Sequence, residues 1–160
     1  MPRKRVGAGA AEAAPPVEIP SALLDELVKG PMTAAEVQAA SLAFKKALIE
    51  RAMGAELSHH LGYRAGEAPP VPQTNHRNGH SDKTVLTDDG PVRIAVPRDR
   101  EGAFEPLLIP KHARRFTGFD DKIIAMYARG MTVREIQAFL RDSYGTEVSP
   151  EFISGVTDAV

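Results

Sequence analysis

The stretch FDDKIIAMYARGMTVREIQAFLRDSYGTEVSPEFISGVTDAV (residues 119–160) decides the expected fold of this chain. Its apolar residues recur every three or four positions, which is the spacing of one face of an α-helix. On the first segment that face is Phe119, Ile123 and Tyr127, and on the second it includes Phe139. Residues that start or stop helices divide the stretch into three: Gly130, Thr132, Glu135, Ser149 and Pro150. The sequence therefore predicts three short helices, the layout of a helix-turn-helix module.

The chain before this module divides by composition. Residues 21–62 are expected to be helical, because Thr33 and Glu36 form a capping box and apolar residues follow at helical spacing to about Leu61. Lys46 and Glu50 stand one turn apart on this helix and form a supporting pair. A helix of this length exposes too much apolar surface to stand alone, so dimerisation through it is one interpretation.

Residues 84–97 change to the alternating pattern of strands around Asp88-Asp89-Gly90, which predicts a β-hairpin. The fold class is therefore mainly α with a small β-hairpin. The expected organisation is a disordered basic, Ala- and Pro-rich tail (1–20), a helical segment (21–62), a linker (63–82), the hairpin with a basic stretch (83–116) and the helix-turn-helix-like module (117–160).

The charge is nearly balanced, with 20 basic and 21 acidic residues, so any nucleic-acid contact must come from local patches. The strongest patch lies between residues 93 and 115 and consists of Arg93, Arg98, Arg100, Lys111, Arg114 and Arg115. A solvated charged face explains it equally well. No cysteine is present, which excludes disulfides and thiolate metal sites. No apolar run approaches the length of a membrane span, so we expect a cytoplasmic protein with no membrane partner.

Three groups of residues invite a metal interpretation and do not support one. His59 and His60 are explained as helix-end residues, and His76 and His80 as loop residues around Asn78-Gly79. Asp88 and Asp89 are explained as turn residues that accept backbone hydrogen bonds. We therefore predict no metal site, no cofactor and no catalytic group in this chain.

An ordered series of motifs resembles bacterial insertion-sequence transposases of the Mutator type, from about residue 23 to 160. The motifs are HLGY (60–63), NGHSDKT (78–84), TDDGPV (87–92), VPRDR (96–100), FEP (104–106), GFDDKII (118–124), YARGMT (127–132), REIQ (134–137) and VSPEFIS (148–154). The series is much more specific than any one motif.

The resemblance implies DNA transposition: binding to the terminal inverted repeats of an element, then strand cutting and joining. It also implies an RNase H-like domain in which two Asp and one Glu hold divalent metal, usually magnesium. In the family those carboxylates lie C-terminal to the matched segment, so none is carried over. Asp88, Asp89, Asp120 and Asp121 match upstream motifs instead. Because the sequence stops within an apolar helix at residues 158–160, we expect a truncated chain that is inactive by itself.

The leading hypothesis is a transposase segment that binds double-stranded DNA at the element ends. The alternatives are a non-enzymatic regulator that binds ends or co-assembles with the full-length transposase, and a helix-turn-helix transcription factor. The expected protein partners are a second copy of this chain, forming a homo-oligomer, or the full-length transposase. The charged residues of the third helix, Glu151 and Asp158, are both acidic, so the basic stretch is the better phosphate binder. The candidate DNA contacts are Arg98, Arg114, Arg115, Arg134, Arg141, Ser149, Ser154 and Thr157.

Overall fold

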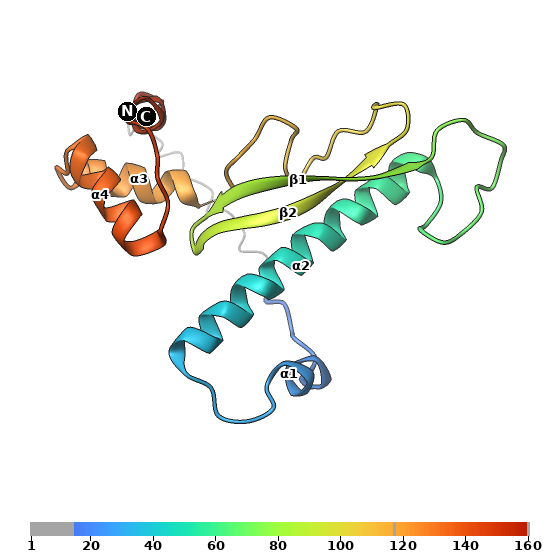
Figure 1. Cartoon of the computed structure of the whole chain (residues 1–160), viewed down its shortest axis with the longest axis horizontal. Helices are drawn as coiled ribbons and strands as arrows, with labels where there is room; N and C mark the ends of the chain where they lie inside the picture. The colour runs from blue at the N-terminus through green and yellow to red at the C-terminus, as the bar shows by residue number, and fades with distance from the viewer. Residues whose placement is uncertain (1–14, 117, 160) are drawn as a thin grey trace, which may run out of the picture. The chain divides into compact units, whose positions relative to one another are not determined.

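The computed structural model describes residues 15–116 and 118–159, so most of the expected N-terminal tail lies outside the described residues. Within them the chain forms five helices and one antiparallel pair of strands (Figure 1). The predicted mainly α fold with a small hairpin is confirmed. The elements are α1 (Ser21–Leu27), α2 (Ala34–Leu61), β1 (Arg77–Thr87), β2 (Gly90–Asp99), α3 (Phe119–Ala128), α4 (Val133–Tyr144) and α5 (Pro150–Thr157).

The chain divides into two compact units, residues 1–37 and 38–160. The first contains α1, none of whose residues is buried, and the first turn of α2. The predicted capping box forms there: the Thr33 N–H donates to Glu36 Oε2 (2.6 Å), and the Glu36 N–H donates to Thr33 Oγ1 (3.2 Å). The start of α2 is therefore fixed by local hydrogen bonds.

The second half of α2 packs against the hairpin. Ile49 and Met53 are buried with apolar residues of both strands and of the segment that follows β2: Val85, Val92, Ile94 and Ile109. An isolated two-stranded hairpin is marginal in water. The helix therefore supplies the apolar surface without which β1 and β2 would not persist.

Side chains of α2 also satisfy the free edge of β2. Lys46 Nζ donates to the Arg93 carbonyl (2.9 Å), and Glu50 Oε1 accepts from the Ala95 N–H (2.9 Å). The predicted Lys46–Glu50 pair is confirmed at 3.5 Å. Because an unpaired strand edge is a site for unwanted pairing, this ion pair protects the sheet as well as supporting the helix.

The first strand is longer than predicted. It begins at Arg77, so residues 77–82 belong to the sheet and the expected linker is wrong over that range. His80 consequently lies in a strand rather than a loop. A bulge between Arg77 and His80 shifts the register, and Gly79 there has a φ of +67°, a conformation that favours glycine. The bulge interrupts the alternation from which a strand is predicted.

The hairpin turn is held differently from the prediction. The Thr87 hydroxyl makes the turn's hydrogen bonds, donating to the Gly90 carbonyl (2.8 Å) and accepting from the Asp89 N–H (3.2 Å). The carboxylates of Asp88 and Asp89 instead both pair with Lys45 Nζ of α2, that of Asp88 at 3.1 Å. The hydrogen bond from Lys45 holds the pKa of Asp88 below its usual value. The turn explanation of these aspartates is therefore incomplete, because α2 supplies a charge partner from far away in the sequence.

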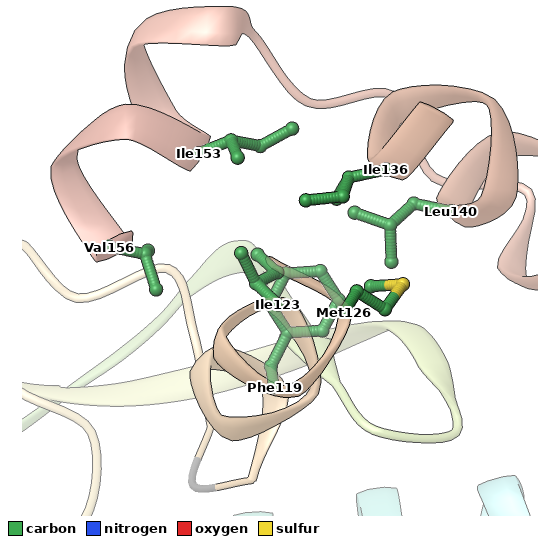
Figure 2. Packing of buried hydrophobic residues seen from close by; sticks show 7 residues of the cluster. All are labelled: Phe119, Ile123, Met126, Ile136, Leu140, Ile153 and Val156. Carbon is green, nitrogen blue, oxygen red and sulfur yellow. The ribbon is translucent and has the colours of Figure 1, made fainter. Parts of the chain in front are cut away.

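Three helices share the other main core. Figure 2 shows side chains of α3, α4 and α5 converging on one another. They are Phe119, Ile123, Met126, Ile136, Leu140, Ile153 and Val156. The predicted caps are confirmed: Thr132 and Glu135 form a capping box, and Ser149 Oγ accepts from the Phe152 N–H (3.1 Å).

Two residues of the predicted apolar faces of the three-helix module are exposed. Tyr127 is 52% exposed, and Met126 is buried in the core instead. The buried residues of α3 are thus spaced four and then three apart, which follows the 3.6-residue turn of a helix more closely than two spacings of four. Phe139 is 42% exposed and packs edge-on against Tyr144.

The hairpin turn is joined to this three-helix core. Leu86 pairs with the segment that precedes α3: its N–H donates to the Arg114 carbonyl (2.8 Å), and its carbonyl accepts from the Phe116 N–H (2.7 Å). Lys122 of α3 donates to the Asp88 carbonyl (2.8 Å) and to the Tyr144 hydroxyl (2.7 Å). One ammonium thus joins the turn, α3 and α4.

The end of β2 is fixed by a buried carboxylate. Asp99 accepts from Asn75 Nδ2 (2.8 Å) and from the N–H groups of Ala103 (3.0 Å) and Phe104 (3.1 Å). Burial by itself would raise the pKa of Asp99, but these hydrogen bonds lower it to about 2. His60 Nε2 lies 3.6 Å from the same carboxylate. The Asp99 side chain therefore shapes the turn over residues 99–104.

Replacing Lys122 with Met should lower the free energy of unfolding by about 1–3 kcal/mol, because the variant keeps the apolar stem and loses two charge-assisted hydrogen bonds. Urea unfolding followed by circular dichroism measures the change. The control is Lys111→Met, which removes one exposed hydrogen bond. Equal midpoints for the two variants would contradict the joining role of Lys122.

Replacing Asp99 with Asn should lower the free energy of unfolding by about 2 kcal/mol at neutral pH. The folded pKa of about 2 lies below the ordinary value of 3.8, so the stabilisation is complete above pH 4 and is lost as the pH falls towards 2. The difference between wild type and variant should therefore narrow over that range. Asp82→Asn, at an exposed ion pair, is the control and should show little effect. A difference that stays constant from pH 4 to pH 2 would argue against the charge of Asp99.

Candidate nucleic-acid interface

An open groove of about 620 Å³ lies beside the hairpin and collects basic side chains from separate parts of the chain. We call it the cationic groove. Its basic residues come from β1, the end of β2, the turn after β2 and the segment before α3: Lys83, Arg98, Arg100, Lys111 and Arg114. Within residues 15–116 and 118–159, the ion pairs that form involve other cations.

The acidic residues that line this groove are engaged elsewhere. Asp82 pairs with Arg93 (3.1 Å), Asp99 accepts the hydrogen bonds described above, and Glu101 accepts from the Thr74 hydroxyl (2.6 Å). The five cations therefore have no carboxylate of their own among the described residues. An anion entering the groove would meet positive charge that is not already compensated at contact distance.

Backbone carbonyls position three of the cations. Lys83 Nζ donates to the carbonyls of Pro110 (2.8 Å) and Lys111 (3.2 Å), and Lys111 Nζ donates to that of Gly102 (3.1 Å). Arg98 Nε donates to the Asn78 carbonyl (3.4 Å). Partial burial, and then the charge of Arg114, lower the pKa of Lys83. A bound phosphate would relieve this repulsion, since an opposite charge favours the protonated amine.

The adjacent residues Arg114 and Arg115 have different surroundings. Arg114 lines the cationic groove, whereas Arg115 makes two 3.1 Å hydrogen bonds to Asp120 and lies 4.7 Å above the ring of Phe152. A second hollow, of about 560 Å³, is lined by both arginines together with Asp120 and Phe152. Arg115 is thus already held in an ion pair.

Two further predicted residues lie together on α4. Arg134 and Arg141 are both exposed and line a hollow of about 430 Å³ with Gln137, Glu147 and Val148. Seven residues of helix separate the two arginines by about 10 Å. Gln137 Nε2 donates to the Val148 carbonyl (3.0 Å) and fixes the loop opposite them. Arg141 Nε also lies 4.0 Å from the exposed carboxylate of Asp142. This α4 face is a second basic surface among the described residues.

Two of the three predicted hydroxyl residues of the α5 group have local partners. Ser149 caps the helix, and the Thr157 hydroxyl donates to the carbonyls of Ile153 and Ser154, both at 3.1 Å. The hollows described above include none of Ser149, Ser154 and Thr157 in the part of their walls that the structure describes. The structure therefore separates the eight predicted contacts into a groove pair (Arg98 and Arg114), the ion-paired Arg115, an α4 pair and an α5 group.

The sequence prediction omits three cations of the groove. Lys83 lies outside the basic patch of residues 93–115, and Arg100 and Lys111 lie within that patch but are not among the predicted DNA contacts. Lys83 pairs with Ile94 across the sheet. The alternation of side chains along β1 places Lys83 on the same face as Val85, and this alternation is the only local sequence pattern that bears on its position. Its carbonyl partners come from far along the chain and were not visible in the sequence.

The histidines that invited a metal interpretation have other neighbours. His60 faces Asp99 and the ring of Phe104, and His76 Nδ1 lies 3.2 Å from the Tyr63 hydroxyl. Across the described residues, no three His, Asp or Glu side chains form a group able to hold a metal ion. Nor does any described helix have the length and apolarity needed to cross a membrane.

Comparison with known proteins agrees with the motifs. The family model for the Mutator family of transposases matches residues 22–160. The probable transposase for an ISRM3-like insertion sequence element of Sinorhizobium fredii is 56% identical over 116 residues, which are 72% of this chain and 28% of that protein. The ISRM3 transposase of Rhizobium meliloti matches to the same extent, and the IS905 transposase of Lactococcus lactis is 36% identical over 120 residues, 31% of its length.

The chain thus spans about 28% of the length of the two ISRM3-type transposases. The match to the family model, over residues 22–160, includes the hairpin, the cationic groove and all three helices of the second core. This chain belongs to the Mutator family of transposases.

Proposed function

We propose that this part of a Mutator-family transposase binds double-stranded DNA at the ends of an insertion sequence, the terminal inverted repeats. The observation that carries the proposal is the cationic groove: five basic side chains, none of which is ion-paired within the part of the chain that the structure describes, converge on a protein whose total charge is nearly balanced. Phosphate contacts of this kind supply most of the non-specific affinity for DNA. The related proteins are named as transposases for insertion sequence elements, whose action requires contact with element DNA.

The two basic surfaces would divide the work. Arg98 and Arg114 would contact phosphates in the cationic groove, and Arg134 and Arg141 would contact the duplex from the α4 face. Arg115 would have to break its ion pair with Asp120 to bind a phosphate, so we propose that it contributes less to DNA binding.

Within the helix-turn-helix interpretation, we propose a smaller role in DNA contact for the α5 group than for α4. α4 and α5 are joined by a short turn in which Gly145 has a φ of +61°, an arrangement that supports such a module. The exposed charges of α5 are Glu151 and Asp158, which would face the phosphates unfavourably. The hydroxyls of Ser149 and Thr157 would also have to exchange internal hydrogen bonds for DNA contacts. We therefore propose that α5 positions α4, and that Ser154 is the one α5 hydroxyl available to DNA.

Strand cutting and joining are proposed for the full-length transposase, with magnesium held by carboxylates of an RNase H-like domain. No carboxylate described above is proposed as one of them. Self-association, or co-assembly with the full-length protein, is proposed through α2, where Leu48 is 54% exposed.

A second candidate function is regulation of the full-length transposase by this chain. The observation that favours it is that both basic surfaces are supported by hydrophobic cores that this chain builds from its own residues, which is what binding to DNA by this chain requires. Such a chain would occupy element ends without cutting them. A separate helix-turn-helix transcription factor is the weakest alternative because of the acidic face of α5.

DNA binding should weaken steeply with salt. With a labelled duplex of the inverted repeat, fluorescence anisotropy should show an affinity loss of about a thousandfold or more between about 50 and 200 mM salt if the groove and α4 together neutralise six or more phosphates. Arg98→Gln with Arg114→Gln should reduce the slope of log affinity against log salt by about 2. Arg51→Gln is the matched control, because Arg51 is exposed on α2 and is not among the described residues that line the hollows.

Absent or salt-insensitive binding by the wild-type chain would refute the DNA proposal. An unchanged slope in the double variant would remove the cationic groove from it and leave α4 as the contact surface.

Co-expression tests the regulatory function. If the chain occupies ends or co-assembles with a full-length relative, it should reduce the transposition frequency of that element in cells. The Arg98→Gln, Arg114→Gln variant should reduce it less if the effect requires DNA binding. An unchanged frequency at equal protein levels would exclude regulation.

A further inference from the structure

The segment after β2 carries an apolar tip that no internal contact explains. Leu107 is 86% exposed and Leu108 is 39% exposed, whereas Pro106 and Ile109 on either side are buried. Single exposed leucines are ordinary on protein surfaces. Two adjacent exposed leucines at the end of an anchored loop are less common.

The loop is held from beneath by α2. Glu56 Oε1 accepts from the N–H groups of Leu107 (2.9 Å) and Leu108 (3.3 Å). The other oxygen of Glu56 is buried and makes no hydrogen bond with any described residue, which is a cost to folding. The helix therefore dedicates a carboxylate to fixing the backbone of the two leucines, so the tip is presented in one conformation.

The chain leads directly from the cationic groove into the tip, which we call its rim position. Pro106, which precedes Leu107, lines the groove, as do Phe104 and the cations Lys111 and Arg114. Phe104 is packed in turn against Leu57 and Leu61 of α2. An apolar side chain on a rigid support, flanked by phosphate-binding cations, is the arrangement by which proteins enter the minor groove and part neighbouring base pairs.

We propose that Leu107 is a wedge that enters the minor groove of bound DNA, partly unstacks one base step and bends the duplex, with Leu108 as its support. This inference rests on the proposed DNA binding and adds a deformation of the DNA to it. The rim position favours DNA over a protein partner. A stable protein interface takes about 800 Å² from each side, far more than two leucine side chains expose.

The experiment uses the full chain and an inverted-repeat duplex with donor and acceptor dyes at its two ends. Wild type should raise the energy transfer between the dyes, as expected for a bend of about 20–90°. Leu107→Gln should abolish that rise while keeping the salt slope of binding, because the groove cations are unchanged. Leu107→Met should retain the bend, and Val71→Gln, at another exposed apolar residue (61%), is the matched control.

The outcomes separate the two proposals. Steep salt-dependent binding by wild type without a bend, or an equal bend with Leu107→Gln, overturns the wedge and leaves DNA binding intact. No binding by wild type overturns both. Urea midpoints equal to wild type establish that the variants are folded, and a loss of self-association in Leu107→Gln without a change in the bend would assign the tip to protein contacts and overturn the wedge.

Discussion

The burial of one face of α2 against the hairpin is the interaction on which the rest of the structure depends. Ile49 and Met53 close the apolar side of β1 and β2, while Lys46 and Glu50 bind the free edge of β2. A two-stranded ribbon has too little apolar surface to be stable by itself, and a long helix with an exposed apolar stripe is equally incomplete. Each therefore requires the other, and the loops that carry the basic residues are built on this pair.

The hairpin turn transmits that arrangement to the three-helix core. Two aspartates at the turn pair with Lys45 of α2, and Lys122 of α3 binds the turn carbonyl and Tyr144 of α4. Leu86 contributes to the helical core on one side of the turn and pairs with the segment before α3. The turn is short and rigid, so ionic and backbone contacts at a single point tie together elements that are distant in the sequence.

The cationic groove is a consequence of the same framework. Its basic side chains come from strands, a turn and a loop, and they meet because Asp99 fixes the end of β2 and Glu56 fixes the loop beyond it. Each of these carboxylates accepts backbone hydrogen bonds and, among the described residues, forms no ion pair with a groove cation. Five cations thus gather in one groove of a protein with almost no net charge. The electrostatic field around this protein is set by where its charged residues lie and not by its net charge.

The sequence by itself determined the helices of the second core, their caps, the Lys46–Glu50 pair, the place of the hairpin turn and the transposase family, because these depend on neighbours within a few residues or on an ordered series of motifs. The tertiary structure alone decided that Met126 and not Tyr127 is buried, that Gly79 forms a bulge and lengthens β1, and that Asp88 and Asp89 bind Lys45. It also brought Lys83 beside Arg114 and separated Arg115 from it. These features depend on contacts between residues tens of positions apart, whose geometry no local period or capping signal encodes.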